Sequence, residues 1–282
     1  MADTPSPTPV ETVGDAGPFV YKPRPVEIIM PLLFTGCFAW LTWNMPAFLM
    51  FFREAGPAVD ALARRYDTVN VFDWLAVAGV VVFFVLGIRT VRRAPSEWED
   101  WGLFDRISVF IGRVTMLLIV ILVSVMVYEV ILRYVFEKPT LWANELSLWL
   151  AGFIFVLAGV YAMQQRSHIR IFLLYDLFPR WLQRVCDTIS ALLIVAFAFF
   201  LFYGAWGEAR DKFLRWETFG TAFDPPIPAT LKPMILLVVV LVAVQAVANL
   251  IRDWNAVPVI HTAADDIDKE DLERLRRQVG SE

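Results

Sequence analysis

The sequence predicts an all-α integral membrane protein with about six transmembrane helices. Of its 282 residues, 58% are hydrophobic and only 19% are charged, and the mean hydropathy is +0.57. A soluble domain has about 25% charged residues. The apolar residues also gather in long runs, each able to cross the roughly 30 Å hydrocarbon layer as a helix. Because lipid offers no hydrogen-bond partner to an open strand, these runs predict helices.

The predicted spans follow one another along the chain and form two units. They are Val26–Phe52, Val71–Val91, Ile107–Phe136, Leu141–Met163, Val185–Trp206 and Leu231–Ile251. Pro31 and Pro46 should bend the first span or shorten its regular part. Pro139 should end the third span. We therefore expect an N-terminal two-helix hairpin at residues 26–93 and a four-helix domain at residues 107–254.

Three segments lie outside these units. Residues 1–25 are rich in Pro, Thr and acids and lack the features of a cleaved signal peptide, so they predict a disordered tail. Residues 94–106 mix acids with Trp and Phe, which predicts a segment along the membrane interface. Residues 255–282 form a charged tail, either free or with a short surface helix. Lys and Arg are somewhat more frequent on the side of both tails, which predicts cytoplasmic termini.

Charged side chains near the span ends predict helix-to-helix contacts. Glu129 and Arg133 are four residues apart on one helix and therefore face the same side, and Glu145 begins the next helix. Because a charge in hydrocarbon is costly unless paired, we expect Arg133 to bind Glu129 or Glu145 and tie two helices together. A proton or ion pathway is the alternative. The long side chain of Arg113 is expected to reach the cytoplasmic surface.

One helix face combines aromatic and acidic side chains. Trp142, Glu145 and Trp149 recur at the spacing of a single helix face. Such a face could bind a partner protein, or it could belong to the aromatic belt of the membrane interface.

Nothing in the sequence predicts catalysis, a cofactor or a metal. The chain has two histidines, His168 and His261, and neither lies inside a predicted span. This excludes a bis-histidine haem within the helices and argues against a histidine metal cluster. Walker A, GxSxG and HExxH patterns are missing from the sequence. No large basic field suggests binding to nucleic acid.

Several short motifs, taken in order, resemble one family of membrane proteins. They are Arg-Tyr-Val-Phe at 133–136, Trp-Ala-Asn-Glu-Leu at 142–146, His-Ile-Arg at 168–170, and a Pro-rich approach to the last span followed by Gln245 and Arg252. Together they resemble the DctQ-type small permease subunit of tripartite ATP-independent periplasmic (TRAP) transporters, over about residues 107–253. Asn144 and Phe172 stand where many members carry acids. The first two spans have no counterpart in the basic four-helix subunit.

The resemblance implies a bacterial inner-membrane protein that scaffolds other subunits and is not an enzyme. Its partners would be a large multi-span permease subunit, which binds the substrate and moves, a periplasmic substrate-binding protein, and membrane lipid. The complex would take up an organic acid or similar solute, coupled to sodium. The candidate structural and subunit contacts are Glu129, Arg133, Trp142, Glu145, Trp149, His168 and Arg170. Two alternatives remain: a membrane anchor for a redox or signalling complex, and an independent channel or transporter.

Overall fold

A computed structural model describes residues 24–53, 57–94, 97, 101–166, 175 and 178–254, and every regular element in these ranges is a helix. Six of the described helices are long and apolar enough to cross a membrane. The predicted all-α membrane class and number of spans are therefore confirmed. Most of the two predicted tails, together with His168 and Arg170, lie outside the described residues.

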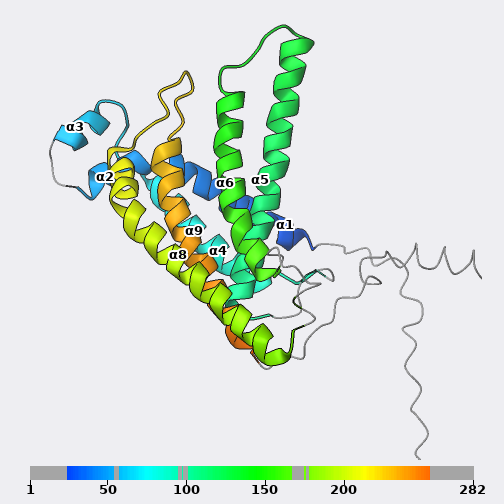
Figure 1. Cartoon of the computed structure of the whole chain (residues 1–282). Coiled ribbons are helices and arrows are strands. Elements are labelled where there is room, and N and C mark those ends of the chain that lie inside the picture. The colour runs from blue at the N-terminus through cyan, green and yellow to red at the C-terminus, as the bar shows by residue number, and fades with distance from the viewer. Residues whose placement is uncertain are drawn as a thin grey trace, which may run out of the picture.

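The N-terminal hairpin consists of α1 (Pro25–Trp43) and α4 (Val71–Thr90), with the short helices α2 (Met45–Phe51) and α3 (Pro57–Ala63) between them (Figure 1). The first predicted span is thus interrupted at Asn44, whose side-chain amide donates to the Trp40 carbonyl at 3.0 Å. Pro46 lies in the first turn of α2, where its missing N–H leaves no helical bond unmade. Pro31 remains within α1.

The other four long helices form two antiparallel pairs, α5 (Leu103–Tyr134) with α6 (Ala143–Gln164) and α8 (Arg180–Arg215) with α9 (Ile227–Asp253). The pairs are joined by packing of α6 against α9. α5 begins four residues before its predicted span, and α8 extends past its predicted span at both ends. With 36 residues, α8 is about 54 Å long. It exceeds the roughly 30 Å hydrocarbon layer, so it must tilt or project from the membrane.

These helices have two distinct ends. The first residues of α5 and α8 and the last residues of α6 and α9 meet at one end, which we call the Asp105 end (Figure 1). The α5–α6 and α8–α9 connections lie at the opposite end, which we call the Glu129 end. Figure 1 shows the α5–α6 connection farthest from the Asp105 end.

The N-terminal hairpin contacts the four-helix unit at two apolar clusters. Near the Asp105 end, Phe110 of α5 is 1% exposed and packs with Phe34 of α1 and Ile88 of α4. Gly87 is required there, because a Cβ atom at that position would lie 2.1 Å from the Phe110 ring. Near the Glu129 end, Leu49 of α2 belongs to a cluster with residues of α3, the end of α8 and α9. The hairpin therefore crosses the unit from α5 to the α8–α9 connection.

Candidate functional site

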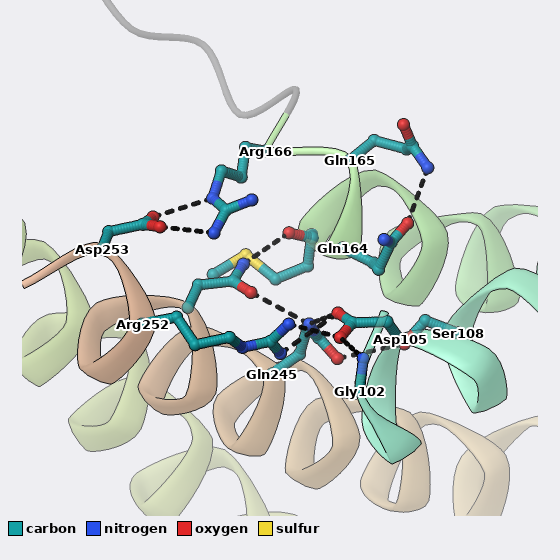
Figure 2. Close-up of polar contacts among 11 residues, drawn as sticks. Gly102, Asp105, Ser108, Gln164, Gln165, Arg166, Gln245, Arg252 and Asp253 are labelled. Carbon is teal, nitrogen blue, oxygen red and sulfur yellow. Dashed lines mark hydrogen bonds and ion pairs between the residues drawn. The ribbon is translucent and has the colours of Figure 1, made fainter. Parts of the chain in front are cut away.

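The carboxylate of Asp105 joins the first turn of α5 to the last turns of α9. Asp105 is 1% exposed and accepts hydrogen bonds from the Gly102 amide at 2.7 Å and from Gln245 Nε2 at 2.9 Å. It also forms an ion pair with Arg252, in which both terminal guanidinium nitrogens donate (Figure 2). A buried carboxylate is stable only when its oxygens are paired in this way.

Further polar contacts extend this joint to α6 and α8. Gln245 accepts from the Ser108 hydroxyl at 3.2 Å and donates to Asn249 Oδ1 at 2.9 Å. Asn249 Nδ2 in turn donates to the Met163 carbonyl of α6 at 2.9 Å. The Arg166 and Asp253 side chains form a partly buried ion pair at 2.5 Å (Figure 2). Arg180 of α8 donates to the Asp253 carbonyl at 2.8 Å. Residues from all four helices therefore meet in what we call the Asp105 joint.

Sequence reasoning did not select Asp105 as a contact residue. It did note Gln245 and Arg252, and Asn249 completes a polar stripe with them at spacings of four and three residues along an apolar helix. Such a stripe in a span predicts a buried polar contact. The partner acid, 147 residues from Arg252, is not specified by any local pattern.

A second buried carboxylate, Glu97, binds the side chain of Arg113. The two groups form an ion pair at 2.8 Å, and the Tyr161 hydroxyl donates to Glu97 at 2.9 Å. The Ala94 amide donates to the other carboxylate oxygen at 2.7 Å. We expected the Arg113 side chain to extend to the membrane surface. It binds the buried carboxylate of Glu97 instead. Gly112 lets Tyr161 approach, since a Cβ there would lie 2.5 Å from the phenol ring.

At the Glu129 end, Glu129 fixes the connection between α5 and α6. The residue is 2% exposed and accepts from Arg133 Nη2 at 2.6 Å and from Nε at 3.1 Å. Its second oxygen accepts from the Thr140 amide at 3.0 Å and from the Thr140 hydroxyl. Of the two partners considered for Arg133, the structure places Glu129 and not Glu145 beside it. Glu129 makes all of these contacts and is the centre of the cluster.

Glu145 and Trp149 face the α8–α9 side of the molecule. Glu145 accepts from the Thr221 hydroxyl at 2.5 Å and from the Phe223 amide at 3.2 Å, both in the α8–α9 connection. The Trp149 indole donates to the Thr230 hydroxyl of α9 at 2.8 Å. These two members of the predicted aromatic and acidic face thus contact α9 and the α8–α9 connection. The third member, Trp142, lies beside Tyr128 of α5, with ring centroids 6.1 Å apart.

The described helices and their polar joints define a multi-pass α-helical membrane protein. Residues 122–256, from the middle of α5 to just beyond α9, match the family described as tripartite ATP-independent periplasmic transporters, DctQ component. This region of the chain belongs to the DctQ-type small permease family, as its motifs predicted, and the chain is a multi-pass protein of the inner membrane.

A curated relative supports the same assignment. The chain is 23% identical over 148 residues to the C4-dicarboxylate TRAP transporter small permease protein DctQ of Vibrio cholerae. The alignment covers 51% of this chain and 62% of the relative, so this chain spans about three fifths of the relative's length. No solved structure matches the chain.

Proposed function

We propose that this chain is the small membrane subunit of a TRAP-type secondary transporter and that it scaffolds the large permease subunit. The observation that carries the proposal is the DctQ match over residues 122–256. That region contains most of a four-helix body whose two pairs are linked by polar contacts at both ends. Polar contacts at both ends of the body resist separation of its helix pairs. Such rigidity suits a scaffold subunit whose partner subunit moves.

An apolar groove on the four-helix body supports a role without substrate binding. The groove has a volume of about 500 Å³ and lies between α6, α8 and α9. Its lining consists of Val156, Leu193, Ile194, Phe197, Leu201, Ile235, Val238, Val239 and Val242. An organic acid or a sodium ion needs charged or oxygen-bearing side chains, and this lining offers none. We accordingly propose that the large permease subunit binds substrate and ion, and that a periplasmic binding protein captures the solute.

The complex would take up an organic acid or similar solute with sodium. In the proposed orientation the Asp105 end and both termini face the cytoplasm. Exposed Arg24, Arg89 and Arg93 at that end of the N-terminal hairpin support this orientation, because Lys and Arg concentrate on the cytoplasmic side of membrane proteins.

Purification from the native membrane tests the proposal. The chain is tagged at its C-terminus, extracted in mild detergent, and its stoichiometric partners are identified by mass spectrometry. We expect a large multi-span permease at a fixed ratio. Recovery of a soluble redox or signalling enzyme would instead make the chain a membrane anchor. Recovery of the chain alone, under conditions that preserve other membrane complexes of the same cell, would favour an independent channel or transporter.

A further inference from the structure

Exposed arginines gather where α1 begins and α4 ends. Arg24 directly precedes α1, Arg89 lies in the last turn of α4, and Arg92 and Arg93 follow that helix; all four are exposed. Arg92 Nε lies 3.9 Å from the carboxylate of Glu27 in the first turn of α1. The two helix ends are therefore adjacent, and their arginines form one group, which we call the arginine rim.

The carboxylates described beside this rim are buried. The side chain of Glu27 is 4% exposed and lies against Arg92. The side chain of Glu97 is 3% exposed and binds Arg113 and Tyr161. Among the described residues, the charges that this end of the hairpin presents to its surroundings are therefore positive. A surface of this kind attracts anions that come from outside the chain.

Exposed apolar faces continue from the rim along both helices. On α1 the exposed residues nearest the rim include Ile28, Ile29 and Leu32, and on α4 they include Val85 and Leu86. The guanidinium groups of the rim lie next to the exposed apolar side chains of the two helices. This arrangement matches a molecule with an anionic head and apolar chains. A soluble acidic peptide would use only the arginines, and a partner transmembrane helix would use only the apolar faces.

We propose that the arginine rim binds anionic phospholipid. The guanidinium groups of Arg24, Arg89 and Arg93 bind the headgroup phosphate, to which arginine can donate two hydrogen bonds at once. The acyl chains lie along α1 and α4. This assigns a role to the two helices that precede the DctQ-type region: they hold the subunit at a fixed depth in an anionic leaflet. The inference rests on the membrane-spanning fold and does not depend on the proposed transporter function.

Lipid retention by the purified full-length chain tests this proposal. The chain is equilibrated in neutral detergent with equal amounts of phosphatidylglycerol and phosphatidylcholine, and bound lipid is counted by native mass spectrometry. The test variant is R89Q/R93Q, which spares Arg92 because of its contact with Glu27. The matched control is R64Q/R210Q, which removes two exposed arginines near the Glu129 end. Circular dichroism and gel filtration check that each variant is folded.

The wild type and the control should retain phosphatidylglycerol in preference to phosphatidylcholine. In R89Q/R93Q the preference should fall by roughly tenfold or more, since each basic side chain near an anionic surface contributes about fivefold. If that variant does not fold, the wild type decides the question, because about 1 M salt should abolish the preference.

Equal preference in all three proteins, or an equal loss in the control, would overturn the proposal. The acidic tail, which contains Asp265, Asp266 and Asp268, provides a further test. A preference that arises only after residues 255–282 are deleted would identify the tail, and not lipid, as the occupant of the rim.

Discussion

Replacement of Asp105 by alanine is expected to lower the free energy of unfolding by about 3 kcal/mol. The substitution leaves the Arg252 guanidinium and the Gln245 amide without their shared acceptor. Breaking a buried ion pair from one side is costly because the remaining charge stays desolvated. The side chain of Arg252 is 28% exposed, so water compensates in part and the lower end of the usual range is expected. Denaturant unfolding in detergent micelles, followed by tryptophan fluorescence, measures the loss.

Asp211→Ala is the matched control for this prediction. Asp211 is an exposed aspartate near the other end of α8, and its loss should leave stability within about 0.5 kcal/mol of the wild type. The double variant D105A/R252A should be less destabilised than the sum of its two single variants, because it leaves neither charge alone. Similar losses from D105A and D211A, or simple additivity with R252A, would show that the Asp105 joint does not hold the helix pairs together.

Replacement of Glu129 by alanine should release the α5–α6 connection from α5. The Thr140 amide and hydroxyl both donate to the same oxygen of Glu129, so the substitution leaves both donors without their acceptor. Hydrogen–deuterium exchange with mass spectrometry reports on this amide directly. Exchange in the peptide covering residues 135–142 should become roughly fivefold faster or more. If the connection contributes to the binding of the large permease subunit, recovery of that subunit should fall as well.

Two further variants show whether Glu129 is the centre of this cluster. Glu137→Ala removes an exposed acid from the same connection and should leave the exchange rate of the Thr140 amide unchanged. Arg133→Ala should raise that rate less than Glu129→Ala does, because Thr140 retains its carboxylate partner. Greater exchange in Arg133→Ala than in Glu129→Ala would instead make the arginine the organising residue.

The spans could be predicted because crossing a bilayer is a requirement on local composition and length. The exact helix ends could not, because charged turns such as Arg180–Gln183 and Glu208–Arg215 continue α8 outside the apolar run. Hydropathy does not detect these turns, whereas backbone hydrogen bonds continue the helix through them. The break at Asn44 agrees with the predicted effect of Pro46. The packing of α2 against the end of α8 and the start of α9 is a tertiary contact that no local pattern specifies.

Some of the polar contacts could likewise be predicted from the sequence, and others could not. The pairing of Glu129 with Arg133 follows from a four-residue spacing on one helix, so the sequence could propose it. The family motifs indicated the DctQ-type region, and the family match confirmed it. Asp105 with Arg252 and Glu97 with Arg113 join separate helices. Their partners are set by the packing of those helices, and one sequence contains no record of that packing.

In the proposed function, the two helix pairs form one rigid scaffold for a partner subunit that moves. The distance between two spin labels, one for each helix pair, reports on this rigidity. Cys37 and Cys186 are replaced by serine, and labels are attached at cysteines introduced for Leu141 and Arg210. Both positions are exposed near the Glu129 end, Leu141 in the α5–α6 connection directly before α6 and Arg210 on α8. Double electron–electron resonance is recorded for the chain alone and for its complex with the copurified partner during uptake. We expect a single narrow distance distribution that is the same in both samples. A second distance population in the working complex would contradict it.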